Sequence, residues 1–111
     1  MPTLLLLADA SRGAEAPNDV VIPRGAGQVR VQAEIDASDT HARYVLSVAD
    51  GAATVFVADA LAPRQSGPYR FVEAVMPAAA FGADVRRIGL RAQGADHDAS
   101  AWTVRARFVD R

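Results

Sequence analysis

The sequence predicts an all-β protein, an immunoglobulin-like antiparallel β-sandwich of about seven strands. Three observations lead to this prediction. Apolar and polar residues alternate along most of the chain, which is the pattern of strands buried on one face. Turn-forming residues separate the alternating segments, and no segment shows a sustained helical period. The 111 residues, 50% of them hydrophobic, are typical of a single domain with its own core, so we expect one domain over residues 1–111.

The alternation is clearest in residues 28–35, where valine, alanine and isoleucine share one face and polar side chains share the other. Similar patterns predict strands over residues 4–8, 28–35, 42–49, 54–58, 69–76, 85–93 and 102–109. In residues 69–76 both faces carry apolar side chains. We expect Val72, Ala74 and Met76 to point inward. The phases of the other strands predict a core that includes Leu46, Val48, Ile88, Leu90, Trp102 and Val104.

Turn signals lie between these segments, at residues 16–19, 23–27, 36–39, 49–52, 62–68 and 93–98. Asp50 and Gly51 form the strongest hairpin signal, because both residues tolerate positive φ. A helical turn is plausible only in residues 77–83, where it would bridge the two sheets. The glycines do not match a phosphate-binding loop, and we interpret them as turn residues.

Composition and charge exclude several classes of protein. The chain has no cysteine, which excludes disulfides, thiolate metal sites and cysteine nucleophiles. Its formal net charge is -1 and its aromatic content is low, so we expect no nucleic-acid partner. The four leucines near the start are too few for a signal-peptide core or a membrane span, and we expect no transmembrane segment in this chain.

Both histidines have aspartates nearby in the sequence: Asp36 and Asp39 precede His41, and Asp96 and Asp98 flank His97. A metal ion needs three or four converging ligands, whereas consecutive Asp-His-Asp side chains point apart. No serine lies in a Gly-x-Ser-x-Gly turn, and the proximity of Ser100 to His97 is only a proximity in sequence. We therefore expect no metal site, no cofactor and no catalytic residues, and we expect that the protein is not an enzyme.

One possible binding surface consists of arginines, which supply all 12 of the basic side chains. If the last two strands pair as a hairpin around residues 94–100, four guanidinium groups share one solvent-exposed face: those of Arg87, Arg91, Arg105 and Arg107. This arginine stripe has two interpretations. It protects a sheet edge with local pairing to aspartates, or it binds an acidic partner such as a carboxylate-rich protein surface, an acidic glycan or lipid headgroups. Arg12 could likewise present its guanidinium or pair with Glu15 or Asp19.

A resemblance to a known family rests on turn and core residues along nearly the whole chain. They are Arg12-Gly13, Val29-Arg30-Val31, Arg43-Tyr44-Val45-Leu46, Asp50-Gly51, Leu61-Ala62-Pro63, Ser66-Gly67, Pro77-Ala78-Ala79 and Phe81-Gly82. In this order they resemble the small extracytoplasmic β-sandwich domains at the C-terminal end of some bacterial transmembrane anti-sigma-factor-like proteins. The resemblance implies a non-catalytic module in the periplasm or outside the cell, although a cytoplasmic location stays open.

The expected function is protein–protein interaction or self-assembly, because the open edges of a β-sandwich can accept a strand from another chain. Exchange of the apolar first strand, residues 4–7, would give a homo-oligomer. The alternative is a module that binds a carbohydrate or another small ligand. The rings whose exposure on a flat face would support it are those of Tyr44, Phe56, Tyr69 and Trp102, although we expect Trp102 in the core.

Overall fold

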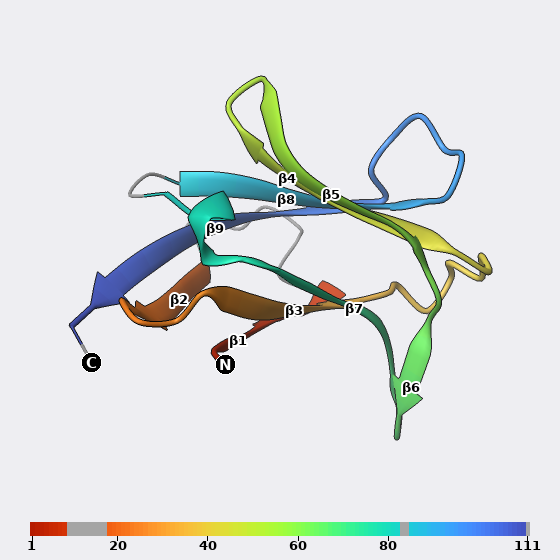
Figure 1. Ribbon diagram of the computed structural model, residues 1–111. Helices are drawn as coiled ribbons and strands as arrows, with labels where there is room; N and C mark the ends of the chain where they lie inside the picture. Colours follow the sequence, from red (N-terminus) through yellow and green to blue (C-terminus); the bar gives the residue numbers. More distant parts are fainter. Residues whose placement is uncertain (9–17, 83–84, 111) are drawn as a thin grey trace.

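The computed structural model describes residues 1–8, 18–82 and 85–110, which form two β-sheets packed face to face (Figure 1). These residues contain nine strands and one 3-10 helix: β1 (Thr3–Leu6), β2 (Asn18–Pro23), β3 (Gln28–Glu34), β4 (Tyr44–Asp50), β5 (Ala53–Leu61), β6 (Arg64–Ser66), β7 (Tyr69–Pro77), η2 (Ala78–Ala80), β8 (Val85–Ala92) and β9 (Ser100–Val109). The prediction of an all-β sandwich is confirmed. Within the described residues, no helix has the length and apolar character needed to cross a membrane.

One sheet has four strands in the order β1-β3-β7-β6, and the other has five in the order β2-β9-β8-β4-β5. Five of the pairings are antiparallel, as the sequence predicts. The two remaining pairings, β1 with β3 and β2 with β9, are parallel. In each of these pairs the strand from the first part of the chain, β1 or β2, lies at the edge of its sheet.

The core lies between the sheets and follows the predicted alternation. All six predicted core residues are buried: Leu46, Val48, Ile88, Leu90, Trp102 and Val104. In β7 the inward set is Val72, Ala74 and Met76, as expected, and Tyr69 and Val75 are exposed on the other face. The four-stranded sheet thus has an apolar inner face and a mixed outer face.

Two of the nine strands were not expected from the sequence. Asn18 and Asp19, interpreted as turn residues, begin β2, whose three apolar residues are too few to show a clear alternation. They pair with β9, far along the chain, and it is this distant partner that makes the segment a strand. The three residues of β6 lie in another predicted turn and form a short hairpin with β7 around Gly67, whose φ is 58°.

The predicted turns that connect the longer strands are confirmed. Asp50 pairs with Ala53 across the β4–β5 hairpin, and Gly51 adopts a φ of 59°. The 3-10 helix η2 lies within the segment expected to hold a helical turn, and it joins β7 of one sheet to β8 of the other. Strand β5 has two register shifts against β4, and Ala60, close to one of them, has a φ of 53°.

Hydrogen bonds hold the end of β1 to both sheets. The indole Nε1 of Trp102, in the five-stranded sheet, donates to the carbonyl oxygen of Leu7 at 2.9 Å. The backbone N–H of Ala8 donates to Glu34 Oε1 of β3, also at 2.9 Å. These contacts, together with the buried side chains of Leu4 and Leu6, make β1 an integral part of the sandwich.

Candidate functional site

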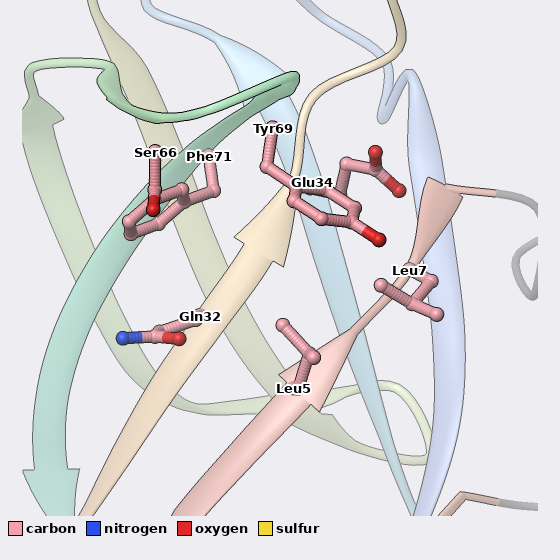
Figure 2. A pocket seen from close by; sticks show the side chains of 7 residues that line it. All are labelled: Leu5, Leu7, Gln32, Glu34, Ser66, Tyr69 and Phe71. Atoms are coloured by element: carbon pink, nitrogen blue, oxygen red, sulfur yellow. The ribbon is translucent and has the colours of Figure 1, made fainter.

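The outer face of the four-stranded sheet contains a shallow groove of about 280 Å³ (Figure 2). All four strands of this sheet, β1, β3, β7 and β6, contribute to the groove. The residues that line it are Leu5, Leu7, Gln32, Glu34, Ser66, Tyr69 and Phe71. In Figure 2, β3 runs along the floor, with Leu5 and Leu7 on one side and Phe71 on the other, and the ring of Tyr69 lies across the end of β3 beside Glu34. The groove therefore has a polar floor and largely apolar walls.

The apolar walls are open to solvent. Leu5 is 55% exposed, Leu7 39% and Tyr69 50%, although each is large and apolar in most of its surface. Single exposed apolar residues are ordinary, but a group of them around one concavity is typical of a binding surface. Leu5 lies in β1, Leu7 directly follows β1, and Tyr69 lies in β7 on the other side of β3, so only the folded sheet brings the three side chains together.

The polar groups near the floor are unequally partnered. Glu73, beside the groove, accepts hydrogen bonds from Gln32 Nε2 at 2.8 Å and from Arg64 at 3.1 Å, and its carboxylate lies 3.8 Å from Arg30. Glu34 accepts only the backbone N–H of Ala8, and it forms no ion pair with any residue that the structure describes. Among the described residues, the Glu34 carboxylate of the groove thus has no positively charged partner.

The arginine stripe lies on the outer face of the five-stranded sheet, where the sequence places it. Arg87, Arg105 and Arg107 are exposed, and Arg91 is half-buried. The side chains are staggered, since Arg87 lies opposite Thr103 and Arg105 opposite Val85. The repulsion expected between like charges directly across a sheet is thereby reduced. The stripe lies on β8 and β9, which are interior strands of their sheet, so it does not protect a sheet edge.

Asp98 pairs with two of the four arginines, which is the local pairing to an aspartate that the protective interpretation included. Its carboxylate lies 2.7 Å from Arg87 and 3.8 Å from Arg91. It lies directly over Gly89, where a Cβ atom would come within 2.4 Å of Asp98 Oδ2. A glycine inside a strand often marks such a close approach, so Gly89 is the signal in the sequence that could have identified this contact.

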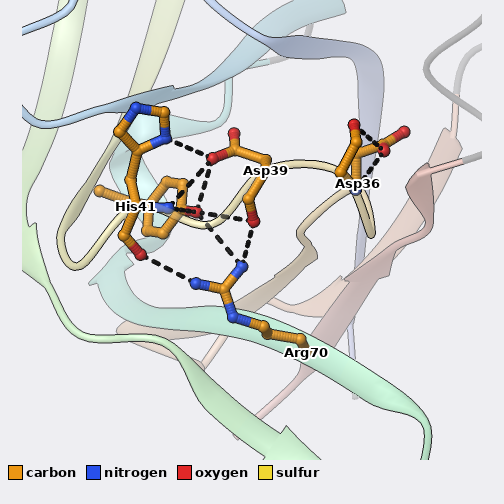
Figure 3. Close-up of polar contacts among 6 residues, drawn as sticks. Asp36, Asp39, His41 and Arg70 are labelled. Atoms are coloured by element: carbon orange, nitrogen blue, oxygen red, sulfur yellow. Dashed lines mark hydrogen bonds and ion pairs between the residues drawn. The ribbon is translucent and has the colours of Figure 1, made fainter.

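A second polar cluster joins the loop before β4 to β7 (Figure 3). Asp39 Oδ1 lies 2.5 Å from His41 Nδ1 and accepts the hydroxyl of Tyr44 at 2.8 Å. Arg70 donates to the carbonyl oxygens of Asp39 and, at 2.8 Å, of His41. Its guanidinium carbon lies 5.6 Å from the centre of the Tyr44 ring. The cluster therefore fixes the loop against the sheet.

The contacts in this cluster also determine its protonation. Burial raises the pKa of Asp39, but hydrogen bonds from His41 and Tyr44 outweigh burial and bring the pKa below its ordinary value of 3.8. Burial, and then the bond to Asp39, raise the pKa of Tyr44 above 10.0. An ionised Asp39 thus accepts a hydrogen bond from a neutral Tyr44, which suits a structural contact.

The histidines do not gather metal ligands. His41 contacts Asp39, but Asp36 accepts from the backbone and hydroxyl of Ser38, at 3.0 and 2.7 Å. Asp98 faces arginines, so His97 and its flanking aspartates do not converge. Across residues 1–8, 18–82 and 85–110 there is no group of three or more His, Cys, Asp or Glu that could hold a metal ion.

The aromatic residues separate into core and surface. Trp102 is 2% exposed, which confirms its place in the core, and Tyr44 is fully buried. Phe56 packs against the core, so Tyr69 is the one of the four candidate rings that is exposed. Arg12 and its suggested partner Glu15 lie outside the described residues.

Comparison with known proteins gives no assignment, because no family model and no curated protein matches the chain.

Proposed function

We propose that this domain is a non-catalytic, extracytoplasmic β-sandwich module that acts by binding other protein chains, including copies of itself. The extracytoplasmic location is supported by the resemblance to bacterial anti-sigma-factor-like domains. The interaction itself is supported mainly by one observation, the character of the edge strand β5.

Among the four edge strands of the described sheets, β5 is the longest, with nine residues. It contains one charged residue, Asp59, and its outward-facing valines are well exposed, Val55 at 44% and Val57 at 49%. Natural proteins usually protect edge strands with charges, prolines or bulges, because free N–H and C=O groups recruit further strands. Strand β5 has register shifts near its two ends but regular pairing at residues 56–58. Its centre is therefore suited to accept another strand.

A second copy of β5 is the simplest such strand. Two copies that pair antiparallel about a two-fold axis near Val57 would form one continuous sheet and would bury the exposed valines together. Exchange of β1, which the sequence also suggests, would first have to open the contacts of its buried leucines and the Trp102 hydrogen bond before a partner copy could restore them. We therefore favour β5 over β1 as the site of association.

The test is sedimentation velocity from micromolar to millimolar protein, with Val57→Lys as the informative variant. We expect the wild type to associate and the variant to remain monomeric, since two lysines near the axis repel each other. Thr103→Lys is the matched control, because Thr103 is exposed on the outer face of the same sheet but on the interior strand β9. A wild type that stays monomeric, or equal loss in both variants, would refute the proposal for β5.

The second candidate is a module that binds a carbohydrate or another small ligand. Its support is the exposed ring of Tyr69 above the polar floor of the groove. Saturable binding of a neutral oligosaccharide that is abolished by Tyr69→Ala would favour this candidate over protein binding.

A further inference from the structure

The groove on the four-stranded sheet is rich in hydrogen-bond acceptors. Gln32 Nε2 is directed to Glu73, which leaves the amide oxygen of Gln32 and the carboxylate of Glu34 as polar groups of the floor. The hydroxyls of Ser66 and Tyr69 can donate or accept. None of the seven described lining residues is basic. The ligand that complements this set is a donor with a positive charge.

The basic side chains nearest to the floor are already engaged. Arg30 and Arg64 are paired with Glu73, and Arg70 donates to the loop carbonyl oxygens of Asp39 and His41. Glu34 is therefore not neutralised from within the described part of the chain, and an external cation would complete its pairing.

The size and the walls indicate what carries the cation. A volume of about 280 Å³ is slightly below the usual range for pockets that enclose small molecules, so a single side chain is the better match. The leucines and the rings of Phe71 and Tyr69 would cover an aliphatic stem. An aromatic ring beside the charge adds a favourable cation–π interaction.

The carboxylate also distinguishes between the two basic side chains. Glu34 Oε1 already accepts the N–H of Ala8, so a bidentate guanidinium would have to share this oxygen with the backbone. An ammonium group needs only one oxygen and acts as a point charge. We propose that this groove binds a lysine side chain of a partner protein. The inference does not rest on association through β5, which lies in the other sheet.

The experiment titrates the folded protein with the peptide Ac-Ala-Lys-Ala-NH₂ and follows the backbone amides by two-dimensional NMR, at a concentration where the protein is monomeric. The uncharged comparison peptide has norleucine in place of lysine. We expect saturable shifts at residues 32, 34, 69 and 71 with the lysine peptide, and binding about fivefold weaker with norleucine, as for a partly exposed ion pair.

Glu34→Gln keeps an acceptor for Ala8 and removes only the charge. We expect it to weaken the lysine peptide about fivefold and to leave the norleucine peptide unchanged. Asp59→Asn, the same change of charge on β5, should alter neither affinity. Equal affinities for the two peptides, an unaffected Glu34→Gln variant, or no saturable shift in the groove would each overturn the inference.

Discussion

The substitution Leu90→Ala tests the packing of the two sheets. Leu90 lies in β8, between β4 and β9, opposite Leu46 and Ser100, and it is 1% exposed. Its strand is hydrogen-bonded on both sides, so the backbone cannot move inward to fill the space that the variant leaves. We therefore expect a loss of about 3–5 kcal/mol in the free energy of unfolding, the upper part of the range for such changes.

The assay is urea unfolding followed by the fluorescence of the buried Trp102, with Leu5→Ala as the matched control. Leu5 is more than half exposed on the outer face, and its truncation should change the stability by less than about 0.5 kcal/mol. The slope of the transition should be unchanged in both variants, so that the midpoint alone reports the effect. A loss below about 1 kcal/mol for Leu90→Ala, or similar losses at the two leucines, would refute the assigned faces of the strands.

Three other predictions concern charged residues. Replacing Arg105 and Arg107 with glutamine should weaken binding to an acidic polymer such as polyglutamate and lower its salt dependence, whereas unchanged binding would refute the interpretation that the stripe binds an acidic partner. Replacing Arg87 and Arg91 with glutamine should instead lower the free energy of unfolding, because Asp98 would lose both of its ion-pair partners. We expect a loss of about 1–3 kcal/mol, measured by urea unfolding. The lowered pKa of Asp39 means that its contribution to stability is complete above its ordinary value of 3.8 and is lost as the pH falls through the lower folded-state value. The stability difference between wild type and Asp39→Asn should therefore shrink as acid is added, and a constant difference would contradict the assigned contacts.

Local sequence patterns predicted the strands that have one buried face and one face exposed to solvent. Residues 28–35 and 102–109 alternate strictly, and their buried and exposed residues follow that alternation. In β2 the polar residues at the start are also good turn formers, and only pairing with β9 decides between the two structures. A parallel pairing between distant segments has no local signature, because the partner supplies the hydrogen bonds.

The candidate site was predictable only in part. The outward direction of the four arginines followed from the phase of their strands, but the position of Asp98 over Gly89 depends on the path of a loop. The groove requires β1, β3 and β7 to lie side by side, and β1 reaches that place through a parallel pairing. That no described arginine pairs with Glu34 depends on which neighbour each of them contacts, which sequence spacing does not determine.

The central claim, that the free edge of β5 accepts another strand, is tested most directly by amide hydrogen exchange at increasing protein concentration. The account predicts that the amides of residues 56–58 which face away from β4 become protected as the concentration rises, while amides of the β8–β9 hairpin do not change. Association without any added protection in β5 would contradict the claim, because the contact would then lie on another surface.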